Sequence, residues 1–394
     1  MTRSNAFIRT LEAAAMRGVL ALIRLRERER PAPVEPQGRQ RVLICKWCCM
    51  GDAIVSLYAI RDFKLRHPEI VIDMLVSSRI AAVYRRAPEI RGVHVLPLTG
   101  RRLTLELLDP RLWLKLAGLL KQLRRNRYGQ FIDLELYRGT GPVLKRLIGI
   151  PYSRGFQVEG ALPKHHDFEV PLPRHMPEWQ CFYRVLGLDI PGENPPALYP
   201  DTRASAPPAP RKGSRIGIVF GSSFNWPQKK WPWERYADLI NLMAADGHGF
   251  VLFGAPDERG EAARILGRIE AGAKGRVADT TGTLDYDGLK REVAACDLVV
   301  GNDTGTMHLA AACDVPTVTL FGPTDPRKWN PLGSSPVFLE HVPCRPCYYL
   351  GSMPSCSHFS CLRQMEPSLV AERIRGLLAG RGKISILGSG PDSP

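Results

Sequence analysis

Residues 299–312 join a run of small apolar residues to a segment that could bind a phosphate. Asp303, Thr304 and Gly305 stand where a buried strand should end and a helix should begin. The first N–H groups of such a helix lack partners within it and lie at the positive end of its dipole, which suits a phosphate. Alternatively, Asp303 or Thr304 could cap the helix. Asp-Thr-Gly is also typical of aspartic proteases, but these need two such carboxylates and this chain has only one Asp-Thr-Gly.

Two further segments place a charged side chain after an expected strand. Lys229 follows the strand at 216–220 on a loop stiffened by Trp-Pro pairs, and such a cation could neutralise a diphosphate. Glu258 follows the strand at 250–253, where the ribose hydroxyls of a nucleotide would lie. The structural alternatives are a solvated surface lysine for Lys229 and an acid in the first turn of a helix for Glu258.

In the N-terminal half, Asp52 follows the strand expected at 42–45 and begins a helix. An acid there is either a helix cap or a general base, and a general base needs hydrogen-bond reach to a hydroxyl. No Gly-x-Gly-x-x-Gly follows a strand and the chain has no P-loop, which argues against NAD chemistry and ATP hydrolysis.

A third kind of chemistry is suggested by cysteines with metal-ligand spacing. The cluster has the pattern Cys-x2-Cys-x8-Cys-x4-Cys and consists of Cys344, Cys347, Cys356 and Cys361. Four thiolates could hold a structural Zn or Fe ion, because soft ligands select these metals. The alternative is four free thiols in a loop, as expected in a reducing compartment.

Short apolar runs alternate with helix-period segments from residue 41 onward, which predicts βαβ units and parallel sheets. The expected strands cover residues 42–45, 71–76, 93–96, 131–134, 216–220, 250–253, 298–300 and 317–321. The expected helices cover residues 53–66, 79–87, 111–126, 142–149, 233–246, 257–271, 286–295, 304–313 and 367–379. We therefore predict an α/β protein with two Rossmann-like, doubly wound domains facing a central crevice.

The predicted organisation has five parts, divided where Pro-rich or Gly-rich composition interrupts the alternation. They are a basic amphipathic helix and linker (1–38), an N-terminal Rossmann-like domain (39–200), a Pro-rich linker (201–213), a C-terminal Rossmann-like domain that holds the cysteine cluster (214–365), and a helix with a loose tail (366–394).

Charge is distributed unevenly along the 394 residues. The net charge is +15, and residues 1–150 hold all of the excess, with 28 basic and 13 acidic side chains. A basic helix at 5–29 could lie on an anionic membrane or pack on its own domain. No apolar stretch is long enough for a spanning helix or a signal-peptide core, so we expect neither secretion by that route nor integration into a membrane.

Taken together, these segments resemble glycosyltransferase family 9, the ADP-heptose:lipopolysaccharide heptosyltransferases, from about Arg41 to Leu378. The motifs that carry the resemblance are Gly51-Asp52, Lys229-Lys230-Trp231-Pro232, Gly254 to Glu258, Asp303-x-Gly305-x-x-His308 and residues 316–324. The chain departs from the family at Leu57-Tyr58, where a Thr-Pro or Leu-Pro is usual.

The resemblance implies a GT-B fold and an inverting transfer that needs no metal or other cofactor. It also implies that the domain 39–200 binds the acceptor and that the domain 214–365 binds the nucleotide sugar. Each motif residue then has an implied role. Asp52 would be the general base on the acceptor hydroxyl, Lys229 would hold the donor phosphates and Glu258 would contact the donor ribose. Asp303, Thr304 and Gly305 would grip the heptose and diphosphate, and His308 would line the same pocket.

The function expected on this basis is heptose transfer from ADP-heptose to the inner core of lipopolysaccharide. The acceptor would be a phosphorylated glycolipid, met at the cytoplasmic face of the inner membrane of a Gram-negative bacterium by a peripheral enzyme. One alternative is a family 9 transferase with a protein acceptor, as in autotransporter heptosyltransferases, or with another nucleotide sugar. Another is a nucleic-acid-binding protein with a four-cysteine finger, disfavoured because that cluster lies in the charge-neutral half.

Overall fold

A computed structural model describes residues 41–47, 49–97, 109–136, 141–157, 166–204, 213–222, 226–349, 352–353 and 355–380. The expected N-terminal helix and linker (1–38), most of the linker 201–213 and the expected tail after residue 380 lie outside the described residues.

The chain forms two compact units. Of the residues that the structure describes, the first unit contains those within 41–49, 59–173 and 179–190, and the second contains those within 50–58, 174–178 and 191–380. The start of one helix (Met50–Tyr58), a short segment (Arg174–Glu178) and residues 191–200 thus belong to the second unit, whereas the sequence placed all three in the domain 39–200. Contacts through space, not chain order, decide this grouping.

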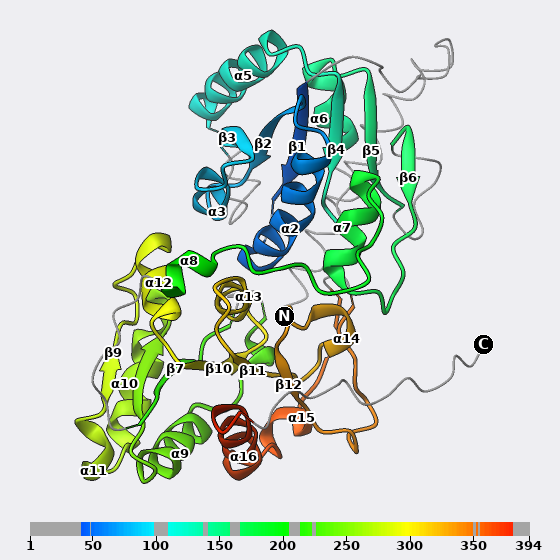
Figure 1. The fold of residues 1–394 in the computed structure, drawn as a ribbon. Coiled ribbons are helices and arrows are strands. Elements are labelled where there is room, and N and C mark those ends of the chain that lie inside the picture. The colour runs from blue at the N-terminus through cyan, green and yellow to red at the C-terminus, as the bar shows by residue number, and fades with distance from the viewer. Residues whose placement is uncertain are drawn as a thin grey trace. The chain divides into compact units, whose positions relative to one another are not determined.

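The first unit contains a six-stranded parallel sheet (Figure 1). Its strands are β1 (Arg41–Lys46), β2 (Val71–Val76), β3 (Ile90–Val95), β4 (Gln130–Asp133), β5 (Tyr152–Phe156) and β6 (Phe168–Val170). The helices that join or flank them are α2 (Met50–Arg66), α3 (Ala81–Arg85), α5 (Pro110–Arg125), α6 (Gly141–Ile148) and α7 (Glu178–Leu186). β1 is buried along its length except for Arg41, as expected of a central parallel strand.

The second unit repeats this plan with its own six-stranded parallel sheet. Its strands are β7 (Arg215–Val219), β8 (Gly249–Phe253), β9 (Val277–Asp279), β10 (Leu298–Asn302), β11 (Thr317–Leu320) and β12 (Ser335–Val337). Its helices are α8 (Pro200–Ala204), α9 (Trp233–Ala244), α10 (Arg259–Arg268), α11 (Ala271–Lys274), α12 (Tyr286–Ala294), α13 (Gly305–Ala312), α14 (Pro326–Trp329), α15 (Ser360–Arg363) and α16 (Pro367–Leu378), with 3-10 turns η1 (Pro227–Lys229) and η2 (Pro256–Glu258).

Both sheets have the same strand order. The first runs β3-β2-β1-β4-β5-β6, and the second runs β9-β8-β7-β10-β11-β12 when read in the same sense. In each sheet the order reverses between the first and fourth strands, and ligands of doubly wound sheets bind at this switch point, beyond the carboxyl ends of the strands. The predicted fold class is confirmed, because both halves are doubly wound parallel sheets.

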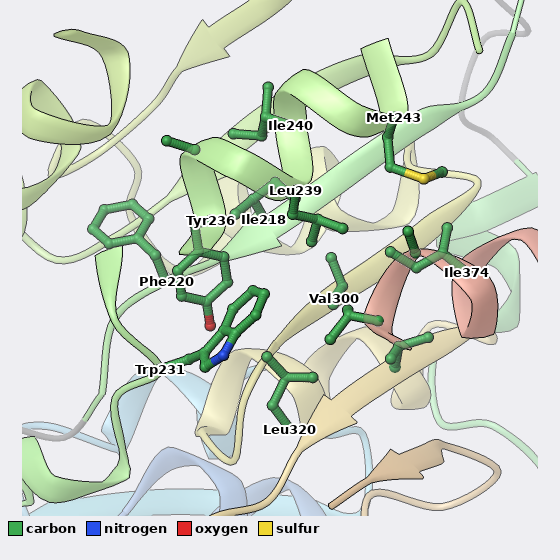
Figure 2. Packing of buried hydrophobic residues seen from close by; sticks show 14 of the residues in the cluster. Ile218, Phe220, Trp231, Tyr236, Leu239, Ile240, Met243, Val300, Leu320 and Ile374 are labelled. Atoms are coloured by element: carbon green, nitrogen blue, oxygen red, sulfur yellow. The ribbon is translucent and has the colours of Figure 1, made fainter. Parts of the chain in front are cut away.

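The core of the second unit packs α9 and α16 against β7, β10 and β11 (Figure 2). Trp231 is fully buried there, with its ring 4.9 Å from the ring of Tyr236 in an edge-to-face arrangement. Its indole Nε1 donates to the Met365 carbonyl at 3.0 Å, so the buried polar atom is paired. Trp231 therefore fixes the end of the loop that carries Lys229.

None of the helices in the described ranges is both long enough and apolar enough to cross a membrane.

Candidate active site

The carboxyl end of β10 leads directly into α13, at the switch point of the second sheet. Thr304 is the N-cap residue of α13, and no side chain from the described residues caps the helix. The capping role that the sequence allowed for Asp303 or Thr304 is therefore not realised. The first turn of α13 keeps its donors and the positive end of its dipole for a ligand.

Lys229 and Asp303 meet at this helix start. Nζ of Lys229 lies 2.9 Å from Oδ2 of Asp303, and only 15% and 7% of the two side chains is exposed. The ring of Tyr348 lies 4.7 Å from the same Nζ. These partners hold the lysine near the α13 terminus, where its charge and the helix dipole act together on an anion.

Two polar atoms beside this pair are buried without a hydrogen-bond partner among the described residues. They are Oγ1 of Thr304 and Nδ1 of His308. Native proteins rarely bury such atoms unpaired, so the two mark a place where a ligand or water completes the structure. Burial lowers the pKa of His308, although the negative charges of Asp303 and Asp52 act to raise it. The ring is therefore neutral near pH 7.

Asp52 lies in the first turn of α2, in the part of that helix that belongs to the second unit. Two glycines allow the helix starts to meet. A Cβ built on Gly51 would lie 2.8 Å from the His308 ring, and one built on Gly305 would lie 2.8 Å from Met50 Cβ. There is no room for a side chain at either position. The glycines of the Gly-Asp and Asp-x-Gly motifs therefore allow the same close contact, between the start of α2 and α13.

Asn302 is a site residue that the sequence analysis did not single out. Its fully buried amide donates to the carbonyls of Phe220 (2.8 Å) and Gly221 (3.0 Å) and accepts the N–H of Trp231 (2.9 Å). The amide thereby ties the end of β7 to β10 and to the Lys229 loop. An Asn before Asp-Thr-Gly at a buried strand end was the available signal.

Glu258 makes more contacts within the protein than a residue that only binds a ribose would need. Its carboxylate accepts the N–H groups of Ser222 (3.0 Å) and Ala255 (2.9 Å) and lies 3.0 Å from Nζ of Lys230. Although burial opposes the charged form, hydrogen bonds to Glu261 and Glu258 raise the pKa of Lys230, which keeps it cationic. Glu258 thus ties the loops after β7 and β8 together, and its contact with a ribose stays a prediction.

We expect Glu258→Gln to lower the free energy of unfolding by about 1–3 kcal/mol, because the buried side chain would offer one acceptor oxygen in place of two to the backbone N–H groups of Ser222 and Ala255. Thermal and urea unfolding measure the loss. Glu261→Gln is the matched control, since Glu261 also binds Lys230 but accepts no backbone N–H in the described contacts. Equal destabilisation by the two variants would contradict the bracing role.

The four predicted thiols come together around one small cavity in the second unit. Cys344, Cys347, Cys356 and Cys361 all line it, and so does Gln228, which adjoins Lys229. No group of three or more His, Cys, Asp or Glu side chains in the described ranges is arranged to hold a metal ion. The thiols are therefore neighbours but not a formed coordination site.

The first unit holds a buried charged group at its own switch point that the sequence analysis missed. Lys46 is fully buried, donates to the Leu134 carbonyl at 3.0 Å and lies 3.7 Å from Glu135. Asp133 is also buried, and its carboxylate lies 3.5 Å from Nε2 of His166. The signal was available, since two acids alternate where β4 ends. Ligands of doubly wound sheets bind at this end, so the buried charged side chains lie where a polar ligand would bind.

Two doubly wound units, with a lysine and an acid near an uncapped helix start in the second, are the features expected of a glycosyltransferase with a GT-B fold. The model of glycosyltransferase family 9 (heptosyltransferase) matches residues 116–354, and the chain belongs to this family. The family predicted from the motifs is thereby confirmed.

Relatives found by sequence agree with this assignment. Lipopolysaccharide heptosyltransferase 2 of Escherichia coli K12 is 25% identical over 310 residues, which cover 74% of this chain and 85% of that protein. Lipopolysaccharide heptosyltransferase 1 of Pseudomonas aeruginosa is 28% identical over 330 residues, covering 78% and 86%. The solved structure of E. coli ADP-heptose lipopolysaccharide heptosyltransferase II superposes with a TM-score of 0.67 at 21% identity, covering 86% and 99%.

Proposed function

We propose that this protein transfers heptose from ADP-heptose to the inner core of lipopolysaccharide. The observation that carries the proposal is the anion site at the start of α13, where Lys229 and the uncapped N–H groups gather beside unpaired Thr304 and His308. The named relatives act on lipopolysaccharide, and one solved relative is named for ADP-heptose.

In the proposed reaction, the acceptor hydroxyl oxygen attacks the anomeric carbon of the heptose. Asp52 takes the hydroxyl proton as the new C–O bond forms. The bond from the anomeric carbon to the diphosphate breaks, and ADP leaves with the electron pair. Lys229 and the N–H groups of α13 stabilise the charge on the leaving diphosphate, so this step needs no metal at the phosphates. Attack opposite the leaving group inverts the anomeric configuration.

The test is incubation with ADP-heptose and truncated lipopolysaccharide acceptors, followed by mass spectrometry of the glycolipid. We expect the acceptor to gain the mass of one heptose as ADP is released. Parallel reactions with other ADP-, UDP- and GDP-sugars test the choice of donor. Transfer from another sugar nucleotide in preference, or donor hydrolysis with no gain by any acceptor, would contradict the proposal.

The acceptor and donor also suggest a location. A glycolipid acceptor with inner-core phosphates lies in an anionic membrane, and the nucleotide sugar is used from the aqueous side. We therefore propose a peripheral enzyme at the cytoplasmic face of the inner membrane. The excess of basic side chains in residues 1–150 supports the contact with an anionic surface.

We further propose that the cysteine cluster holds a structural Zn or Fe ion. The donor chemistry fits, because four thiols line a single cavity and soft ligands select these metals. The arrangement in the structure does not yet bring three ligands together, so binding requires the thiols to close on the ion.

Metal analysis of purified protein should then find about one Zn or Fe per chain, in keeping with a four-thiolate site. A double Cys347→Ser/Cys361→Ser variant should lose the ion, whereas Cys181→Ser, at a buried cysteine outside the cluster, should keep it. Because Tyr348 contacts Lys229, loss of the ion should also weaken ADP binding. Metal-free wild-type protein with full affinity and stability would exclude the ion.

A further inference from the structure

Exposed apolar side chains concentrate on one pair of helices in the first unit. Among the described residues, seven large hydrophobic side chains are exposed, and Trp113, Leu114 and Leu147 are three of them. Trp113 and Leu114 lie on α5, the teal helix at the top of Figure 1, with 52% and 75% of each residue exposed. Leu147 lies on α6, which packs against α5. Clustered apolar side chains that are exposed to water often mark a surface that binds a partner.

The sequence of α5 fixes which side faces outward. Asp109 caps the helix by accepting the Arg111 N–H at 2.9 Å. Leu112 and Leu123 are buried beneath it, about three turns apart. The opposite side carries Leu114 and, about two and three turns later, Lys121 and Arg125. Small residues separate these, and the outward row, named here the α5 stripe, comprises Leu114, Ala117, Gly118, Lys121 and Arg125.

The charged residues within α5 are all basic. Residues 110–132 contain six Lys or Arg and no Asp or Glu. At the C-terminal end of α5, the Arg124 guanidinium donates to the Leu147 carbonyl at 2.9 Å, which joins the exposed leucine of α6 to the basic end of α5. The surface therefore offers an apolar end with Trp113 and Leu114 and a basic end with Lys121 and Arg125.

This combination suits a bilayer better than a protein partner. Lysine is depleted at protein–protein interfaces, whereas the α5 stripe sets Lys121 on the same outward row as the exposed Leu114. In the membrane interface, Trp and Leu enter the boundary of the acyl chains while basic side chains attract anionic headgroups. Trp is also the side chain most enriched, with Tyr, at that depth.

We infer that the α5 stripe, together with Trp113, is a contact surface for a bilayer of anionic phospholipid. It lies in the described part of the chain and acts in addition to any contact made by the helix expected at 5–29. The inference extends the proposed function without depending on it, because vesicle binding is measured without donor or acceptor.

The experiment is co-sedimentation of the full chain with phosphatidylglycerol-containing vesicles and, separately, with pure phosphatidylcholine vesicles. Wild type should bind the anionic vesicles selectively, and more weakly at high salt. Lys121→Gln/Arg125→Gln should bind about 25-fold more weakly, from about fivefold for each charge. Leu114→Ser should weaken binding by about tenfold, because the bilayer would no longer bury a leucine side chain.

Matched controls come from the second unit. Leu369→Ser changes a leucine of α16 that is 40% exposed, and Lys290→Gln removes a lysine of α12; both should bind the vesicles as wild type does. Circular dichroism and ADP affinity should be the same for all variants. The inference is overturned if the α5 variants bind as tightly as the controls, or if wild type binds phosphatidylcholine equally well or neither vesicle.

Discussion

Replacing Asp52 with alanine is expected to lower kcat for heptose transfer by about 10²- to 10⁴-fold, the usual contribution of a general base. ADP affinity should stay nearly unchanged, because Lys229 and the start of α13 remain in place. The loss of activity is expected because Asp52 lies beside the candidate donor site. It stands in the first turn of α2, and its negative charge acts on His308, whose pKa is nevertheless lowered by burial.

Two variants separate the loss of a base from the loss of a helix-start acid. Asp52→Asn keeps the size of the side chain but removes its basicity, so it should be as inactive as Asp52→Ala. Asp287→Asn removes an acid from the first turn of α12 and should keep full activity. Rates are measured from ADP release with a lipopolysaccharide acceptor at saturating donor. Wild-type turnover by Asp52→Asn would remove Asp52 from the mechanism.

Lys229→Ala is expected to weaken binding of ADP and ADP-heptose by about 10- to 100-fold, as for loss of one hydrogen bond to a charged group. Isothermal titration calorimetry measures the change. Lys290→Ala is the matched control, because Lys290 also lies over an aromatic ring, at 4.9 Å from Tyr199 compared with 4.7 Å from Tyr348 for Lys229. Unchanged affinity in a folded Lys229→Ala protein would refute the phosphate role.

The same substitution leaves Asp303 buried without its lysine, which should reduce the free energy of unfolding by about 3–5 kcal/mol. The double variant Lys229→Ala/Asp303→Asn should recover much of that stability, since the uncompensated charge is gone. It should not recover affinity for ADP, since no cation is restored. If the double variant recovered both stability and ADP affinity, Lys229 would act on ADP binding only by neutralising Asp303.

Alternating hydrophobic and helical segments were enough to predict most of both sheets. The predicted strands at 71–76 and 250–253 match β2 and β8 closely, because buried parallel strands are short apolar runs with clear ends. β5, β6, β9 and β12 were not predicted. β5 contains Arg and Gly in five residues, and the other three have only three residues each. Segments so short gain their strand conformation from pairing with neighbours, which leaves no periodic trace.

The candidate site, too, was predictable from the sequence only in part. Gly51 and Gly305 were visible as motif positions, but their reason is a tertiary one, since each leaves room for the other helix start. Asn302 and the buried group around Lys46 went unrecognised, because nothing local distinguishes a buried polar side chain from a solvated one.

The sequence by itself determined the fold class, the family and the residues that follow each strand, because these depend on local periodicity and on motif spacing. Only the tertiary structure decided which partner each charged group has. Lys229 and Lys230 are adjacent in the chain, yet one pairs with Asp303 and the other with Glu258 and Glu261. Likewise, the cysteine loop lies more than a hundred residues from Lys229 but contacts it through Tyr348. Such pairings follow from the order of strands in the sheet, which brings distant loops to one edge, and no local pattern encodes that order.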